Sequence, residues 1–201
     1  MEKKGQEITL QKGDALIMVD LQNDFLPGGS LAVPMGDEVI PVMNSYIKAM
    51  KDNSLPVFAT RDWHPPHHSS FQENGGLWPP HCIAETEGAK FAANLELPPE
   101  VAIISKAMEI ETDAYSGFEG TDLDAQLKSL NVKRLLIGGL ATDYCVLNTV
   151  RDALKLGYDV LLLEDASRAV NVKPDDGAKA IKEMISLGAK AININSLRNS
   201  V

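Results

Sequence analysis

The stretch that decides the fold is residues 134–145, which read RLLIGGLATDYC. It opens with a continuous apolar run and passes through two glycines into a segment with apolar residues on one helical face. These are Val146, Val150, Ala153 and Leu154. A strand that is apolar at every position suits a parallel sheet, and an apolar stripe suits a helix that covers the sheet. The stretch therefore predicts a strand, a glycine turn and a covering helix.

The same unit recurs along the chain. Further strand-like runs lie at 15–19, 56–60, 101–105, 160–163 and 191–194, and further helical stripes lie at 39–50, 123–130 and 178–185. Gly157 and Gly188 stand where helix C-caps belong. This alternation predicts an α/β fold, a Rossmann-type three-layer sandwich with a central, mostly parallel sheet of about six strands and helices on both faces. We take residues 1–201 as a single domain.

Composition narrows the class of partner. Of the 201 residues, 44% are hydrophobic and 23% are charged, which is usual for a globular domain. The formal net charge of −9, with no Lys/Arg cluster, excludes nucleic acid and anionic membrane surfaces as expected partners and leaves a small molecule. Residues 1–7 contain no apolar segment of a secretory signal, so we expect a cytoplasmic protein with Cys82 and Cys145 as free thiols. A homo-oligomer is left open.

The histidines are gathered in one place. All four lie between residues 64 and 81, as His64, His67, His68 and His81. They belong to a long Pro- and Gly-rich connection, residues 62–99, and loops of this length in a compact domain are usually functional. We predict that this connection is a metal-binding wall of an active site, with a short helix near residues 87–94.

Polar residues follow the predicted strands at the edge where ligands bind in open α/β sheets. They are Asp20, Asp62, Lys106 and, after the glycine turn, Cys145. With Thr142 as N-cap, Cys145 would lie in the first turn of a helix, where the helix dipole lowers a thiol pKa. Asp20 would then act as a general base, and Lys106 would pair with it or offset developing negative charge. The alternatives are a buried structural cysteine, a turn aspartate and a surface lysine.

A metal site is the second candidate in this region. Asp62 and His64, two positions apart at a strand end, point the same way, and His81 can complete three ligands with open positions. His68 is the candidate for a fourth ligand. Taken singly, each histidine also fits an ordinary hydrogen-bonded residue, and two histidines with one carboxylate also fit a mononuclear iron oxygenase. Phe25 and Trp78 flank the site and could sandwich a flat ring, although packing alone would explain them.

Five motifs carry a resemblance to a known family. Residues 19–25 (VDLQNDF) resemble the opening motif of the isochorismatase-like cysteine hydrolases. The motifs TRDWHP (60–65), WPPHC (78–82), ISK (104–106) and GLATDYCV (139–146) resemble those of the nicotinamidase branch. The resemblance spans about residues 14–195 and implies the isochorismatase-like form of the predicted fold.

The resemblance also implies roles for individual residues. Asp20, Lys106 and Cys145 match the catalytic triad, and Phe25 and Trp78 match the residues that stack on a pyridine ring. Asp62, His64 and His81 match the ligands of one divalent metal, zinc in the first place, with iron or manganese as alternatives. The Leu140–Ala141 bond matches a cis peptide that borders the substrate and turns the Ala141 N–H, beside the Cys145 N–H, toward the oxyanion.

The implied activity is hydrolysis of nicotinamide to nicotinate and ammonia through a cysteine thioester, in NAD salvage. A different small-amide hydrolase of the same superfamily and a non-enzymatic, metal-stabilised binding module are the alternatives. Relatives that act on ureido or carbamoyl substrates lack the metal motif, which argues against the first of these.

Overall fold

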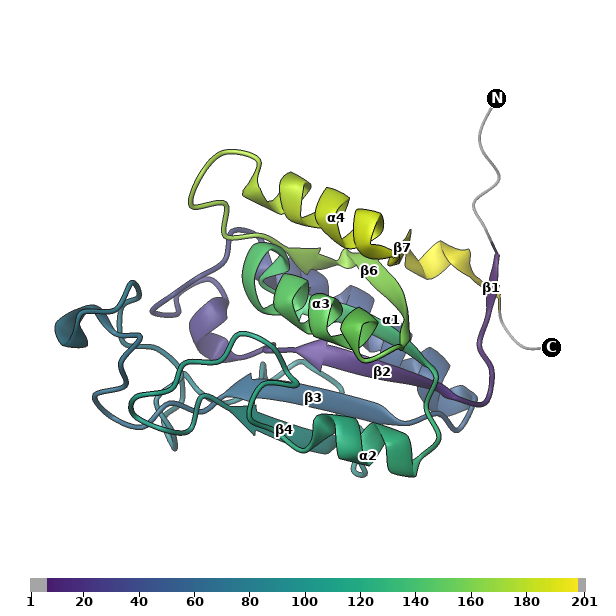
Figure 1. Cartoon of the computed structure of the whole chain (residues 1–201), viewed down its shortest axis with the longest axis horizontal. Coiled ribbons are helices and arrows are strands. Elements are labelled where there is room, and N and C mark those ends of the chain that lie inside the picture. The colour runs from purple at the N-terminus through teal and green to yellow at the C-terminus, as the bar shows by residue number, and fades with distance from the viewer. Residues whose placement is uncertain (1–6, 199–201) are drawn as a thin grey trace.

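A computed structural model describes residues 7–198, and its centre is a six-stranded parallel sheet (Figure 1). The spatial order is β4-β3-β2-β5-β6-β7, and every neighbouring pair is parallel. The strands are β2 (Asp14–Val19), β3 (Val57–Asp62), β4 (Ala102–Lys106), β5 (Arg134–Leu140), β6 (Asp159–Arg168) and β7 (Lys190–Ile192). The predicted sheet is thereby confirmed. Residues 1–6, part of the stretch examined for a secretory signal, lie outside the described residues.

Helices cover both faces of the sheet, as predicted. They are α1 (Val39–Asp52), α2 (Leu123–Ser129), α3 (Leu147–Lys155) and α4 (Asp176–Leu187). Alternate residues of one strand enter opposite cores: Leu16 and Met18 of β2 pack with α1, whereas Ile17 packs with α2, α3 and α4. The result is the three-layer sandwich, because each face of the sheet buries its own apolar cluster.

Two parts of the sheet differ in extent from the prediction. Strand β6 continues past residue 163 to Arg168, and its pairing with β5 shifts register between Ile137 and Gly139. A small second sheet, which was not predicted, pairs β1 (Ile8–Thr9) with β8 (Leu197–Arg198) in parallel. Two-residue strands carry too few positions for a hydrophobic pattern.

The helix predicted near residues 87–94 is wrong. These residues, all of them described, form no helix, and Phe91 instead pairs with Gln22 in an isolated antiparallel bridge. Backbone carbonyls 87–90 accept hydrogen bonds from the backbone or side chains of Gln22, Asn23 and Asp24. Because these carbonyls have partners across the chain, they are unavailable to a local helix. The short 3₁₀ helices are Asn23–Phe25, Gly36–Glu38, Gln72–Asn74 and Ile194–Ser196.

The turn after β5 also differs from the prediction. Residues Thr142–Val146 form a π-helical turn before α3, and its N-cap is Ala141 rather than the predicted Thr142. The Ala141 carbonyl accepts hydrogen bonds from the N–H groups of both Tyr144 and Val146, each at 3.1 Å. The wider turn begins one residue earlier than a regular helix capped by Thr142 would.

In the part of the chain that is described, no helix combines the length and the apolar character needed to cross a bilayer.

Gly139 of β5 lies directly against the backbone of Val19 in β2. A Cβ atom at this position would lie 2.1 Å from the carbonyl oxygen of Val19, and the residue has φ +131°. Gly157 has a similar left-handed φ of +91°, but nothing lies within 4 Å of a Cβ built there. Alanine substitutions at the two positions therefore distinguish the cost of a positive φ, which both share, from the cost of a steric clash, which only Gly139 has.

We expect Gly139→Ala to lower the free energy of unfolding by about 3 kcal/mol or more, because it adds overpacking to an unfavourable φ. Gly157→Ala should lower the free energy of unfolding by only about 1 kcal/mol, because the positive φ is its only cost. Urea unfolding of the two variants and the parent measures both changes. Equal losses would contradict the close β2–β5 approach.

Candidate active site

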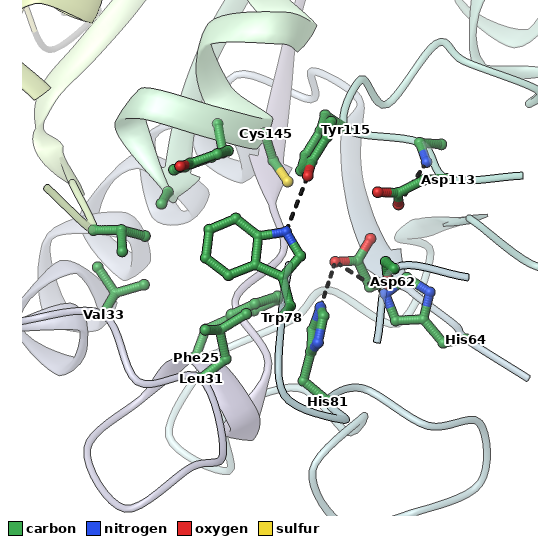
Figure 2. A pocket seen from close by; sticks show the side chains of 15 residues that line it. Phe25, Leu31, Val33, Asp62, His64, Trp78, His81, Asp113, Tyr115 and Cys145 are labelled. Atoms are coloured by element: carbon green, nitrogen blue, oxygen red, sulfur yellow. Dashed lines mark hydrogen bonds and ion pairs between the residues drawn. The ribbon is translucent and has the colours of Figure 1, made fainter. Parts of the chain in front are cut away.

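The candidate active site lies at the carboxyl edge of the sheet. Side chains from the ends of β2, β3 and β4 and from the turn after β5 converge there, as topology predicts. A cavity lies at this edge, and Asp62, Trp78 and Cys145 are among its lining residues (Figure 2).

Lys106 stands at the centre of the site and is 1% exposed. Its Nζ lies 2.9 Å from Asp20 Oδ2 and 3.5 Å from Cys145 Sγ, and it forms a second ion pair with Asp62 Oδ1. Asp62 and Lys106 are register partners in β3 and β4, which explains why their side chains meet. Nζ also donates to the Ala114 carbonyl at 3.1 Å. Burial alone lowers the pKa of Lys106, but the two carboxylates raise it well above its usual value, so the ammonium stays charged.

Asp20 is buried and held from two sides. Besides Lys106, its Oδ1 accepts a hydrogen bond from Thr60 Oγ1 at 2.6 Å. Burial raises the pKa of Asp20, Lys106 lowers it and Asp62 raises it again, with a net value above the ordinary one. Thr60 was not predicted as a site residue, although it opens the motif at 60–65. A carboxylate with a raised pKa is the better proton acceptor.

Cys145 lies beside these groups, with its sulfur and oxygens of Asp20 and Asp62 all within 4.8 Å of one another. Burial raises the pKa of the Cys145 thiol well above its usual value, against the opposing effect of Lys106, and Asp20 and Asp62 raise it further. The predicted lowering of this pKa by a helix N-terminus is therefore wrong, because burial and two carboxylates outweigh the cation. The Cys145 thiol is therefore protonated at neutral pH.

Asp62, His64 and His81 form the second half of the site, and their candidate ligand atoms all lie within 4.8 Å of one another. Oδ2 of Asp62 is 3.7 Å from His64 Nε2 and 4.0 Å from His81 Nε2, whereas Oδ1 pairs with Lys106. Nδ1 of His64 faces the Ala107 carbonyl at 3.3 Å, and Nδ1 of His81 faces the Pro79 carbonyl at 2.8 Å.

These contacts fit a metal. A backbone carbonyl requires the proton on Nδ1, so each Nε2 presents a lone pair toward Asp62. Nε2 of His64 is buried and has no hydrogen-bond partner among the described residues. An unsatisfied buried nitrogen beside a carboxylate is the arrangement expected where a divalent cation completes the site.

His68 and His67 are placed differently. The ring of His68 is buried 4.2 Å from that of His64, but its Nδ1 contacts Ser70 Oγ at 2.8 Å and its Nε2 contacts the Thr112 carbonyl at 3.2 Å. Both of its nitrogens therefore have partners other than a metal. His67 is exposed and lies 3.7 Å from Glu73.

Aromatic side chains form the walls of the cavity. Phe25 and Trp78 both line it, and the indole Nε1 of Trp78 donates to Tyr115 Oη at 3.0 Å (Figure 2). Trp78 also meets the ring of Tyr144 edge-on, with ring centroids 5.0 Å apart. Tyr115 and Tyr144 were not predicted as site residues, although Tyr144 lies in the motif at 139–146, directly before Cys145.

The backbone of the turn also borders the cavity. The Leu140–Ala141 peptide is cis, as the resemblance implied, and Ala141 lines the cavity with Cys145. The oxyanion role of their N–H groups stays a prediction. Both cysteines of the chain, Cys82 and Cys145, are free thiols, as expected.

Gln22 holds the backbone of Asp62, one of the three candidate metal ligands. Its fully buried carboxamide accepts from the Asp62 N–H and donates to the Asp62 carbonyl, both at 2.8 Å, and also donates to the Ala89 carbonyl at 2.9 Å. Asp24 likewise accepts from the Cys82 N–H at 2.7 Å, next to His81. Gln22 and Asp24 lie in the motif at 19–25, but these contacts were not predicted.

Comparison with known proteins places this site in context. Residues 14–196 match the model of the isochorismatase domain. A nicotinamidase of Escherichia coli is 40% identical over 196 residues, which cover 87% of this chain and 92% of that protein. A pyrazinamidase of Pyrococcus horikoshii in complex with zinc is 51% identical with a TM-score of 0.87, covering 90% of this chain and 99% of that one. PnC1 from L. infantum in complex with nicotinate is 34% identical with a TM-score of 0.89, covering 96% and 98%.

The environment of His64 leads to a pH prediction for the metal-free protein. Burial, together with His81 and His68, lowers the pKa of His64 to about 2 from its usual 6.5. Below pH 6.5 the unfolded chain therefore takes up a proton that the folded chain refuses, so stability falls as pH falls. The slope contributed is up to about 1.4 kcal/mol per pH unit.

We expect His64→Asn to remove this slope between about pH 4.5 and 6.5, as measured by urea unfolding at several pH values after chelation. The exposed His67→Asn is the matched control and should keep it. The assignment fails if His64→Asn and the parent lose stability equally as the pH is lowered.

Proposed function

The chain belongs to the isochorismatase family, and we propose that it is a nicotinamidase, an amidohydrolase that converts nicotinamide to nicotinate and ammonia. The observation that carries the proposal is that the buried Lys106 contacts both Asp20 and Cys145 and also pairs with Asp62, and that Cys145 and Asp62 line the same cavity. The similarity to a nicotinamidase and to a protein in complex with nicotinate supports this substrate. The reaction would serve NAD salvage, and a cytoplasmic location stays a proposal with it.

The reaction begins with the substrate ring between the aromatic walls, where Phe25 and Trp78 line the cavity. Asp20 takes the proton of the Cys145 thiol, and the sulfur attacks the carboxamide carbon. The N–H groups of Ala141 and Cys145 stabilise the oxyanion, where each donor contributes about 2.7–4 kcal/mol. Asp20 then gives the proton to the leaving nitrogen, the C–N bond breaks and ammonia departs.

The second half of the reaction hydrolyses the thioester. Asp20 takes a proton from water, the hydroxide oxygen bonds to the carbonyl carbon, and the C–S bond breaks. Asp20 returns that proton to the sulfur, and the nicotinic acid formed releases its own proton to solvent and leaves as nicotinate. Lys106 keeps Asp20 oriented throughout and stabilises negative charge on sulfur, which lies 3.5 Å from its Nζ.

Asp62, His64 and His81 would hold one divalent metal, and we propose zinc, with iron and manganese as alternatives. When bound, the metal supplies a Lewis-acidic anchor for the pyridine nitrogen of the substrate. The zinc complex of the P. horikoshii relative supports zinc. The contacts of Asp62 divide its two oxygens between the metal site and Lys106.

The test is ammonia release from nicotinamide by the purified, metal-replete protein. Stoichiometric ammonia and nicotinate support the proposal. Release from another small amide but not from nicotinamide would assign a different amidohydrolase of the family. Turnover that requires O₂ and ferrous iron would instead favour an oxygenase, and no turnover would favour a binding module.

We expect Cys145→Ala to abolish turnover while metal content persists, because the variant lacks the nucleophile but keeps all three metal ligands. Cys82→Ala, at the other buried free thiol, is the matched control and should remain active. Coupled ammonia detection and elemental analysis measure both properties. Near-parent activity in Cys145→Ala would disprove the assignment.

Metal binding should depend on the predicted ligands and not on their neighbours. His81→Ala should bind zinc at least tenfold more weakly, in line with loss of a ligand. His68→Ala and the exposed His67→Ala should each keep one bound zinc, because both ring nitrogens of His68 have other partners. Calorimetric zinc titration of chelated protein distinguishes these variants, and loss of zinc from His68→Ala would add it to the ligand set.

A further inference from the structure

One carboxylate links the segment after β6 to the turn that carries Cys145. Pairing between β5 and β6 ends at Leu140 and Arg168. Beyond it, the N–H of Val170 donates to Asp143 Oδ1 at 2.9 Å, and the N–H of Asn171 donates to Asp143 Oδ2 at 2.8 Å. Where the strand pairing ends, two charge-assisted hydrogen bonds to the Asp143 side chain connect the chain after β6 to the turn after β5.

This link reaches the cavity on one side. Val170 lines the cavity and packs against the hydrophobic core. Asp143 itself lies two positions before Cys145, in the same π-helical turn. One side chain therefore sets the distance between the nucleophile's turn and an apolar wall of the site.

The segment between β6 and α4, residues 169–175, is also held by contacts with α4 that do not involve Asp143. Asn171 Oδ1 accepts from the Gly177 N–H at 2.9 Å, and a Cβ atom at Gly177 would lie 2.5 Å from the Cβ of Ala169. Near α4, Asp176 Oδ2 accepts from the Lys173 N–H at 2.9 Å. The segment is thus fixed to α4 independently, and Asp143 is its support toward the cavity.

We propose that Asp143 is a positioning residue that fixes Val170 and so sets the size limit for the ring of a heteroaromatic carboxamide beside Cys145. The identity of the substrate rests on the proposed function, whereas the effect on the width of the cavity does not. Asp143 takes no part in proton transfer. Its loss should weaken the packing of the ring and admit larger groups.

Steady-state kinetics with nicotinamide give the first test. Asp143→Ala should raise KM about tenfold and change kcat by less than about threefold, the pattern of lost uniform binding. Asp143→Asn keeps one acceptor oxygen and should show a smaller change in the same direction, which also serves if the alanine variant folds poorly. Asp176→Ala, which removes a carboxylate from the same segment, is the matched control and should leave KM within about twofold.

A double-mutant cycle shows whether Asp143 affects KM through the position of Val170. In a Val170→Ala background, Asp143→Ala should raise KM by no more than about twofold, because the side chain that it positions is already gone. Independent, multiplicative effects of the two substitutions would overturn the proposal, as would a fall in kcat without a change in KM.

A second measurement needs no turnover. Cys145 is alkylated with iodoacetamide and, separately, with the bulkier N-ethylmaleimide, and peptide mapping locates the adduct. Both reagents react with the thiolate, so the ratio of the two rates cancels any change in the thiolate fraction and reports the access of the bulkier reagent. Asp143→Ala should raise the N-ethylmaleimide to iodoacetamide ratio at least fivefold over the parent and over Asp176→Ala, and an unchanged ratio would overturn the proposal. If nicotinamide is not a substrate, this ratio still tests the positioning role.

Discussion

The site depends on one buried cation placed between two buried carboxylates. Lys106 is held against Asp20 and Asp62, and all three side chains are nearly inaccessible to solvent. Two carboxylates this close in a dry environment could not both stay ionised without the ammonium. Lys106 pairs with one oxygen of each carboxylate. Asp20 lies beside the Cys145 thiol, and the other oxygen of Asp62 faces the two histidines. The proposed nucleophile Cys145 and the proposed metal ligand Asp62 therefore share a single electrostatic centre.

The order of the strands makes this arrangement available. Asp20 directly follows β2, whereas Asp62 and Lys106 are the last residues of β3 and β4, and these three strands are neighbours in the sheet. Parallel pairing brings these ends to one edge, and the β3–β4 register sets Asp62 opposite Lys106. Cys145 arrives from the other neighbour of β2, through the turn after β5. Gly139 lets β5 approach the β2 backbone there, so the backbone geometry beneath the site is as constrained as the charges within it.

What could be predicted from the sequence follows from local periodicity. Continuous apolar runs located the six strands, and the two-residue spacing of Asp62 and His64 placed both on one side of a strand end. Contacts between distant segments leave no such trace. Gln22 reaches Asp62 across 40 positions, and the same residues 22–24 hold carbonyls 87–90 in place of the predicted helix. Thr60 and Asp143 lie within the motifs at 60–65 and 139–146, but their partners come from tertiary packing, which local periodicity does not reveal.

The pKa of Cys145 is raised, whereas its position after the glycine turn predicted that it would be lowered. A helix N-terminus alone would favour a standing thiolate, but burial and the neighbouring carboxylates keep the sulfur protonated. Asp20 is subject to the same burial, which raises its own pKa and makes it a stronger base. Both pKa values are therefore raised, and the shift of Asp20 offsets part of the free-energy cost that the shift of the thiol adds to moving a proton from sulfur to oxygen. Proton transfer can then accompany attack on a bound amide, while Lys106 stabilises whichever of the two atoms carries the negative charge.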